Sequence, residues 1–229
     1  MHRHMTAPAD KQRDGDGTRP EAVLLVGPSG SGKTPLGDAL QAGGLWGRAC
    51  AHFDFGRTLR ACARGEGGVS LTPAEEALVR RMLRTDALLP DEHFPLAERL
   101  FRAFLEAHRA AADTPNGKAG ALVVLNGLPR HVGQAARMDG LVRMRAVVDL
   151  RCPEEIVLAR LRRDTGGDRD GRDDDAPARL RRKLAVFREQ TEPLLATYRE
   201  RGVRVIPLDV GAATTAEAMR TELERHPPP

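Results

Sequence analysis

The sequence predicts an α/β protein in which a five-stranded parallel sheet carries helices on both faces. Short apolar runs alternate with helical stretches from residue 21 onward. These runs are apolar throughout, which is the pattern of strands buried on both sides. A glycine-rich turn joins the first apolar run to the first helical stretch. Because such strands need cover on both sides, the alternation predicts helices packed against each face of the sheet.

Each element is predicted from its own residues. The strand candidates are the apolar runs at 22–26, 49–53, 121–125, 146–150 and 203–208. Helix candidates include residues 32–41, 73–85, 91–112, 153–163, 178–201 and 214–225. The helix at 73–85 has a good start, because Thr72 can cap it, Pro73 suits the first helical position and Glu75 follows in the first turn.

Composition excludes several classes of protein. The 229 residues are 41% hydrophobic, enough for one sizeable core, yet no aliphatic run approaches the roughly 20 residues that span a membrane. Residues 1–20 have no apolar stretch after their basic start, so we expect no secretory signal, no membrane and a cytoplasmic location. The same residues are too polar to fold, which predicts a disordered tail. Three cysteines without CxxC spacing are expected in the core: Cys50, Cys62 and Cys152.

Charge alone gives only a weak indication of a partner. The net charge is +4, from 36 basic and 32 acidic residues. A basic balance is compatible with nucleic-acid binding. Aromatic residues make up only 3% of the chain, however, so there is little from which to build a stacking platform for single strands. Nucleic acid is therefore the last of the alternatives, and no such partner is expected.

The strongest functional signal is the segment Gly27-Pro28-Ser29-Gly30-Ser31-Gly32-Lys33-Thr34. It matches G-x-x-x-x-G-K-[ST], the P-loop, and lies directly between a predicted strand and a predicted helix. Its glycines let backbone N–H groups turn toward a phosphate, and the helix N-terminus adds partial positive charge. Lys33 then reaches the β and γ phosphates, and the Thr34 hydroxyl can ligate Mg²⁺. All eight residues are predicted to bind a nucleotide.

A P-loop alone defines binding and not a reaction, so the ends of the other strands matter. Ligands of open α/β sheets collect at the carboxyl ends of the strands. Polar and basic segments follow three of the predicted strands, at 52–60, 126–134 and 160–172. These segments predict a second substrate beside the phosphate loop.

The same segments resemble the adenylate kinase family of nucleoside monophosphate kinases, and the resemblance covers nearly the whole chain after Glu21. FGRTLR, ending at Arg60, resembles the family's TGDxLR, and NGLPRHVGQ, from Asn126 to Gln134, resembles DGFPRxxxQ. LLPDE at 88–92 resembles LVTDE, and residues 172–198 resemble RxDDxxxxxxxRLxxYxxxTxPLxxYY. Four blocks in the family's order, together with the P-loop, are far more specific than any one of them.

The resemblance implies phosphoryl transfer from ATP, with Mg²⁺, to a nucleoside monophosphate, AMP first, giving two nucleoside diphosphates. It also implies one P-loop kinase domain over 21–229, with an acceptor-binding segment at about 54–85 and a short lid at about 163–177. We expect a monomer. The implied catalytic residues are Lys33, Arg130, Arg160 and Arg172. The implied acceptor site is Phe55, Arg60, Gly127, Arg130 and Gln134, with Arg60 and Arg130 holding the acceptor's phosphate, and the implied metal site is Thr34 and Asn126.

Three positions depart from the family pattern. Phe55 stands where the family has the Thr that contacts the acceptor base, which leaves CMP, UMP or dAMP open as acceptors. Lys183 stands where the family has Arg. Asn126 stands where the family has an Asp near the hydrated Mg²⁺, so Asn126→Asp is expected to lower the Mg²⁺ requirement. The competing interpretation is that Asp54 already supplies the charge, in which case a second anion would add repulsion.

Two other functions remain open on the sequence alone. A P-loop kinase of a sugar acid or polyol would use the paired arginines on a carboxylate or another small acceptor. A nucleotide-binding regulatory protein without turnover would explain Asn126 and Phe55. An acceptor screen separates these functions.

Overall fold

The structure, a computed structural model, describes residues 19–66, 68–112, 120–163 and 177–229. Its centre is a five-stranded sheet in the order β2-β3-β1-β4-β5, with every neighbouring pair parallel. The strands are β1 (Glu21–Val26), β2 (Cys50–Asp54), β3 (Leu122–Asn126), β4 (Arg143–Arg151) and β5 (Arg204–Asp209). This confirms the predicted five-stranded parallel sheet, with strand ends shifted by up to three residues. All but the last two residues of the predicted disordered tail, and nearly all of the predicted lid, lie outside the described residues.

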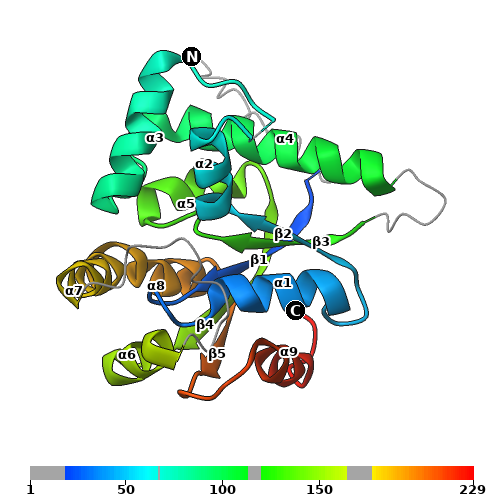
Figure 1. Cartoon of the computed structure of the whole chain (residues 1–229). Helices are drawn as coiled ribbons and strands as arrows, with labels where there is room; N and C mark the ends of the chain where they lie inside the picture. Colours follow the sequence, from blue (N-terminus) through cyan, green and yellow to red (C-terminus); the bar gives the residue numbers. More distant parts are fainter. Residues whose placement is uncertain (1–18, 67, 113–119, 164–176) are drawn as a thin grey trace, which may run out of the picture.

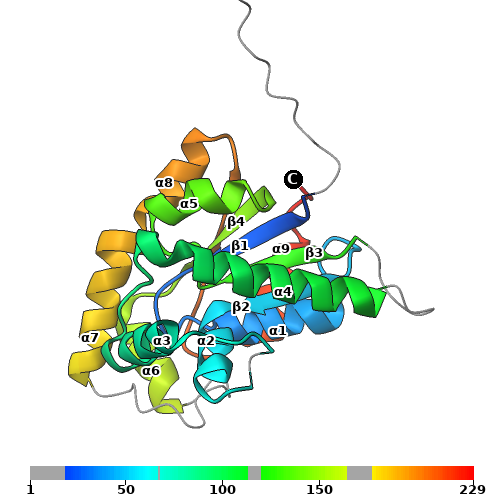
Figure 2. The ribbon, with the colours of Figure 1, turned by 90° about the horizontal axis from the view of Figure 1, so that it is seen from above.

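Helices cover both faces of the sheet, as predicted (Figure 1). One face packs against α1 (Lys33–Gly43), α6 (Glu154–Arg163), α7 (Pro177–Val186) and α9 (Ala216–Glu224). The other packs against α2 (Phe55–Ala63), α3 (Pro73–Thr85), α4 (Phe94–Ala112), α5 (Val132–Asp139) and α8 (Pro193–Glu200). Seen from above, α4 lies across the middle of this second face, between α2 and α3 on one side and α5 and α8 on the other (Figure 2).

The central strand shows why the sheet needs both layers. In β1, Ala22, Leu24 and Val26 belong to the core on the α4 side, whereas Val23 and Leu25 belong to the core on the α1 side. All five are buried, so side chains that alternate across the sheet are apolar on both faces. The three cysteines are buried as expected. Among the helices that the structure describes, none is long and apolar enough to cross a membrane.

The helix predictions need three corrections. The sequence did not predict two short helices: α2, which directly follows β2, and α5, which begins a few residues after β3. The helix expected at 91–112 begins with a 3₁₀ turn, η1 (Asp91–His93), before α4. The single helix expected at 178–201 is interrupted by a π-helical turn, η2 (Phe187–Thr191), because Pro193 lacks the N–H that would continue an α-helix.

The capped start of α3 is present as the sequence predicts. The Thr72 hydroxyl accepts a hydrogen bond from the Glu75 N–H at 3.3 Å, and the Glu75 carboxylate accepts one from the Thr72 N–H at 2.8 Å. Pro73 occupies the first helical turn. This reciprocal pair satisfies backbone N–H groups that a helix start otherwise leaves unpaired.

Strand register brings the polar strand ends together. Leu25, near the end of β1, pairs with Asn126 of β3, and Asn126 pairs with Asp54 of β2. Parallel strands point their carboxyl ends to one edge, so the residues that follow β1, β2 and β3 meet there. The P-loop, between β1 and α1, lies at this edge.

Candidate nucleotide-binding site

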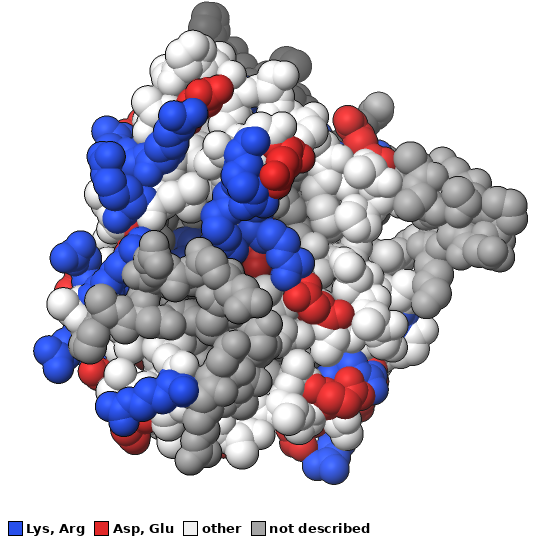
Figure 3. Space-filling model, viewed as in Figure 1, with Lys and Arg blue, Asp and Glu red and all other residues white. Residues whose placement is uncertain are grey.

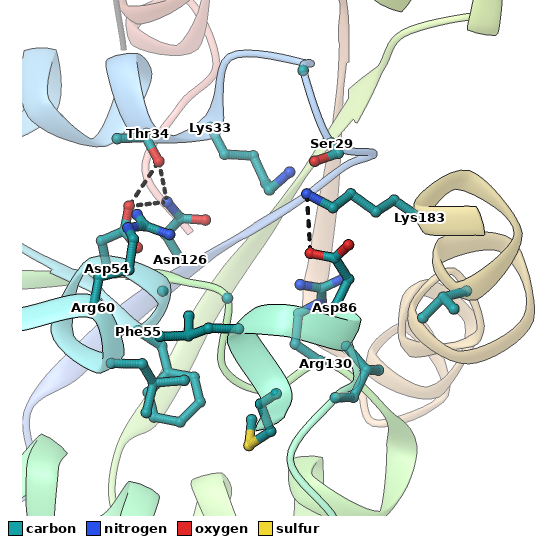
Figure 4. Close-up of a pocket in the computed structure, with 18 of the residues that line it drawn as sticks. Ser29, Lys33, Thr34, Asp54, Phe55, Arg60, Asp86, Asn126, Arg130 and Lys183 are labelled. Atoms are coloured by element: carbon teal, nitrogen blue, oxygen red, sulfur yellow. Dashed lines mark hydrogen bonds and ion pairs between the residues drawn. The ribbon is translucent and has the colours of Figure 1, made fainter. Parts of the chain in front are cut away.

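A cavity of about 500 Å³ lies at this edge of the sheet (Figure 4). The P-loop and α1 form one wall, and α2, the end of α3 and the following loop form another. The remaining lining residues come from the ends of β2 and β3, from the turn and α5 that follow β3, and from α6 and α7. A cavity of this size falls within the range of small-molecule sites. This one pocket therefore contains residues predicted to bind the nucleotide together with residues predicted to bind the second substrate.

The P-loop adopts a conformation that depends on its glycines. Gly30 and Gly32 have φ values of 84° and 94°, in the left-handed region that residues with a side chain rarely enter. Gly32 is also the N-cap of α1, so the turn leads directly into the helix N-terminus. The Lys33 Nζ donates hydrogen bonds to the carbonyl oxygens of Gly27 and Pro28, both at 2.7 Å. The Lys33 side chain thus lies against the backbone of the P-loop.

The predicted loop residues divide by position. Five of the eight line the cavity: Ser29, Gly30, Gly32, Lys33 and Thr34. The other three, Gly27, Pro28 and Ser31, are buried and do not line the cavity. The Ser31 hydroxyl has no hydrogen-bond partner in the described structure. Gly27 cannot carry a side chain, because a Cβ would lie 2.8 Å from Ser31 Oγ and 2.9 Å from Leu150 Cβ. The role of all eight in nucleotide binding stays a prediction.

Three polar side chains meet beside the P-loop, one from each of α1, β2 and β3 (Figure 4). The Thr34 hydroxyl donates to Asp54 Oδ2 at 2.7 Å. The Asn126 amide nitrogen donates to the same Asp54 oxygen and to Thr34 Oγ1, both at 3.0 Å. Asp54 and Asn126 are buried, yet both line the cavity. The predicted metal residues Thr34 and Asn126 are therefore together, with a carboxylate between them.

Asp54 is the site residue that the sequence analysis assigned only as an alternative. It ends β2 and caps α2, where its Oδ1 accepts a hydrogen bond from the Arg57 N–H at 2.8 Å. Its backbone carbonyl also accepts one from the Thr58 hydroxyl at 2.9 Å. An Asp placed one residue before a helix start is the sequence signal that could have predicted both α2 and this side chain.

The predicted phosphate arginines of the acceptor lie in the same cavity. Arg60 comes from α2, and Arg130 comes from the turn between β3 and α5. The Arg130 backbone N–H donates to the Gln134 side chain at 2.8 Å, and its Nε donates weakly to Thr191 Oγ1 at 3.4 Å. Burial lowers the pKa of the Arg130 guanidinium from its usual value. A guanidinium shielded from water binds an anion more strongly than an exposed one.

The other acceptor residues also line the cavity or border it. Phe55 is buried at the first turn of α2, with its ring 6.2 Å from that of Phe53. Gly127 has a φ of 83° and lies close to Phe55. The Gln134 amide nitrogen donates to the Leu89 carbonyl at 2.8 Å, and its oxygen accepts from Arg130. Each half of this amide keeps one further hydrogen-bonding position, so the predicted contact with an acceptor base stays a prediction.

Arg160 lies at the cavity wall but is bonded in a way that the sequence did not indicate. Its guanidinium donates to the carbonyl oxygens of Gly30 (3.3 Å), Gly211 (2.9 Å) and Thr214 (2.7 Å). It thereby connects α6 with the P-loop and with the turn before α9. Its predicted phosphate contact stays a prediction. Arg172, the other predicted phosphate contact of this part of the chain, lies outside the described residues.

An ion cluster in the cavity was not predicted from the sequence. Asp86, just after α3, has a φ of 57° and accepts hydrogen bonds from Arg179 through both carboxylate oxygens. Lys183 Nζ lies 3.3 Å from the same carboxylate. Both basic residues belong to α7, so the cluster joins the predicted acceptor segment to the helix that follows the predicted lid. The pairing joins residues more than 90 positions apart, which no local pattern signals.

Basic side chains gather outside the cavity as well. In the view of Figure 3, Lys and Arg side chains cluster over α2 and α3, with acidic side chains between them. The arginines of α2 and α3, together with the residue at the C-terminal end of α2, are Arg57, Arg60, Arg64, Arg80, Arg81 and Arg84. Such a surface raises the local concentration of phosphate-bearing ligands.

A parallel sheet with a P-loop after its first strand, and with two further arginines in the same pocket, defines a P-loop kinase. Among known proteins, an adenylate kinase of Xanthomonas campestris pv. campestris is 30% identical over 189 residues, covering 79% of this chain and 86% of that protein. Another, from Xylella fastidiosa, is 27% identical over 186 residues, covering 79% and 87%. The chain belongs to the adenylate kinase family. No family model matches the sequence.

Proposed function

We propose that this protein transfers the terminal phosphoryl group of ATP to a nucleoside monophosphate, AMP first, and releases two nucleoside diphosphates. The observation that carries the proposal is that one cavity contains both the P-loop and the two arginines Arg60 and Arg130. In the reaction, the bond between the γ phosphorus and its bridging oxygen breaks, and a bond forms to a phosphate oxygen of the monophosphate. The adenylate kinases to which the chain is similar support AMP as the acceptor.

The arrangement suits a reaction that depends on position and charge. Two anionic phosphates must approach each other, so the protein has to hold them in line and offset their repulsion. We assign the ATP phosphates to the backbone N–H groups of the P-loop and to Lys33. We assign the acceptor's phosphate to Arg60 and Arg130, which reach the cavity from α2 and from the turn between β3 and α5. Fixed cations of this kind need no reorganisation as the charge moves.

The donor atoms near Thr34 fit Mg²⁺. This cation prefers oxygen ligands and keeps several waters when a nucleotide supplies the rest of its contacts. The Thr34 hydroxyl would hold the metal, and the Asn126 and Asp54 side chains lie within hydrogen-bonding distance of that hydroxyl. When bound, Mg²⁺ neutralises charge on the transferring phosphoryl group.

An acceptor screen tests the proposal. ADP release would be measured by a coupled assay with ATP and Mg²⁺, using AMP, dAMP, CMP, UMP and a sugar acid as acceptors. We expect the highest kcat/KM with AMP. A Lys33→Ala protein assayed in parallel shows which turnover belongs to this pocket.

Each other outcome favours a stated alternative. Preference for a different monophosphate would assign the change in specificity to Phe55, whose ring replaces a hydroxyl at the acceptor site. Turnover with the sugar acid in place of the monophosphates would overturn the proposal. ATP binding without turnover on any acceptor would support the regulatory alternative.

A further inference from the structure

The Thr34 hydroxyl has one position left for a metal. A hydroxyl has one hydrogen to donate and two lone pairs to accept with. The hydrogen is donated to Asp54 Oδ2, and one lone pair accepts from the Asn126 amide. The second lone pair is the one with which the oxygen can ligate a cation. Because Asp54 takes the hydroxyl hydrogen, it determines where that lone pair points.

The hydrogen bonds that hold the Asp54 carboxylate in the described structure come from uncharged groups. Its three hydrogen-bond donors are a hydroxyl, an amide and a backbone N–H, from Thr34, Asn126 and Arg57 respectively. None of these donors carries a formal charge, so they hold the carboxylate in place without neutralising it. Oδ2 accepts two of the bonds and Oδ1 accepts one, which leaves Oδ1 able to accept another from a metal-bound water.

Asn126 is a hydrogen-bond donor at this point, whereas Asp54 is an acceptor. Its amide nitrogen has two hydrogens, and the structure directs that nitrogen at Thr34 Oγ1 and at Asp54 Oδ2. The side chain therefore acts as a donor that holds a hydroxyl and a carboxylate 2.7 Å apart. An Asp at the same position has no hydrogen to give when ionised.

We propose that Asp54, and not the residue at the end of β3, is the carboxylate that fixes hydrated Mg²⁺ beside Thr34, and that Asn126 positions this carboxylate. The inference rests on the proposed function for the presence of a Mg²⁺–nucleotide complex in the pocket. P-loop proteins commonly hold Mg²⁺ with the loop's Ser or Thr and one strand-end Asp. In this chain the strand-end Asp comes from β2, the edge strand next to β3.

The proposal reverses the outcome expected from the sequence for Asn126→Asp. The substitution would put a second carboxylate about 3.0 Å from Asp54 Oδ2, where the amide nitrogen now lies. Two anions at this distance repel each other, and the donor that holds Asp54 would be lost. The Asn126→Asp protein should therefore bind Mg²⁺ less tightly than the wild type, and not more tightly.

Metal binding measured without turnover tests the proposal. Mn²⁺ would be titrated into the protein with saturating ADP, and free Mn²⁺ followed by electron paramagnetic resonance. We expect Asp54→Asn to raise the Kd of Mn²⁺ by about 10- to 100-fold, the range seen when residues that orient a metal site are removed. Asn is as good an N-cap as Asp, so the start of α2 is kept. The affinity for ADP in EDTA should change much less than the affinity with Mg²⁺.

Three further proteins sharpen the result. Asn126→Asp should weaken Mn²⁺ binding, and the exchange Asp54→Asn with Asn126→Asp should recover part of it, because one carboxylate and one amide again face Thr34. Glu98→Gln is the control, since it removes a surface carboxylate of α4 that is paired with Arg102 and does not line the cavity. It should leave the ratio of ADP affinities with and without metal unchanged.

Two results would overturn the proposal: an unchanged Mn²⁺ Kd in Asp54→Asn, or tighter Mn²⁺ binding in Asn126→Asp. If Asp54→Asn did not fold, as judged by thermal denaturation, the Asn126→Asp result would still decide. These measurements need no acceptor. Failure of the proposed function would instead appear as absent turnover in the acceptor screen, with metal binding through Asp54 intact.

Discussion

The two halves of the cavity are built in different ways. The half that we assign to ATP is formed mainly by one continuous segment, the P-loop at 27–34, whose conformation follows from its own glycines. The acceptor half takes Arg60 from α2, Arg130 and Gln134 from the turn and helix after β3, and Asp86 from the end of α3. These residues are held by contacts between distant segments, such as Gln134 with Leu89. From this difference we expect substitutions in the ATP half to lower the rate of phosphoryl transfer. Substitutions in the acceptor half should also lower the stability of the contacts that hold this half together.

The largest effect is expected in the ATP half. Lys33→Ala removes the cation assigned to the β and γ phosphates and should lower kcat by roughly 100- to 1000-fold, the cost of removing one fixed group that stabilises transferring charge. Initial rates with saturating ATP and AMP provide the measurement. Arg102→Ala, on the exposed surface of α4, is the control and should match the wild type. Activity of Lys33→Ala within tenfold of the wild type would refute the P-loop assignment.

The acceptor half should respond differently. Arg60→Ala and Arg130→Ala each remove a charge-assisted contact to the acceptor's phosphate worth about 1.5–3 kcal/mol, which corresponds to roughly a 10- to 150-fold loss in kcat/KM for AMP. ATP affinity, measured by calorimetry, should stay within a few fold. Arg64→Ala, one turn further along from Arg60 and paired with Glu66 at the surface, is the matched control. Loss of ATP affinity with AMP kinetics retained would mean that the two halves are assigned in reverse.

Assembly of the acceptor half is tested by Asp86→Asn. Asn tolerates the left-handed backbone at this position, so the substitution removes charge and leaves the turn intact. Arg179 and Lys183 would then face each other without this carboxylate, and we expect the free energy of unfolding to fall by about 1–3 kcal/mol. Urea denaturation provides the value. Glu98→Gln, which removes an exposed pair on α4, should change it by less than about 0.5 kcal/mol, and an equal change in both proteins would contradict a special role for Asp86.

The smallest effect concerns the start of α3. Hydrogen bonds from Arg99 and from the Thr72 backbone lower the pKa of Glu75 to about 2. A carboxyl group with a lowered pKa stabilises the fold above its ordinary pKa near 4.5, and this contribution disappears as the pH falls toward 2. Water screens this surface pair, so Glu75→Gln should cost about 0.5–1 kcal/mol at neutral pH.

The pH dependence of that small difference is the measurement. Unfolding free energies of the wild type and of Glu75→Gln should converge between pH 4.5 and pH 2. Thr72→Ala, which removes the hydroxyl cap but keeps the Glu75 carboxylate and its contact with Arg99, should stay less stable than the wild type across that range. A difference between the wild type and Glu75→Gln that grows on acidification would contradict the assignment.

Elements with a strong local signal were predictable. The five strands and the capped α3 follow from apolar runs and from Thr72-Pro73, and the P-loop follows from its spacing. The short helices α2 and α5 were missed because each has only eight or nine residues, too few for a clear helical pattern. The break at η2 was missed because residues 178–201 look helical throughout, although Pro193 marks the place.

The sequence by itself determined the parallel sheet, the phosphate loop and the family, since each depends on residues adjacent in the chain or on ordered blocks of them. Only the tertiary structure decided what surrounds Thr34. On the sequence alone, Asn126 is interpreted as a weakened metal position. The register of β2 and β3 places the Asp54 carboxylate 3.0 Å from its amide nitrogen, which supports the different role that we propose. Likewise, the ion pairs of Asp86 with Arg179 and Lys183 depend on the position of α7 next to the end of α3. The physical reason is that hydrogen bonds and ion pairs depend on separation in space, and the separation of distant segments is set by packing of the whole core.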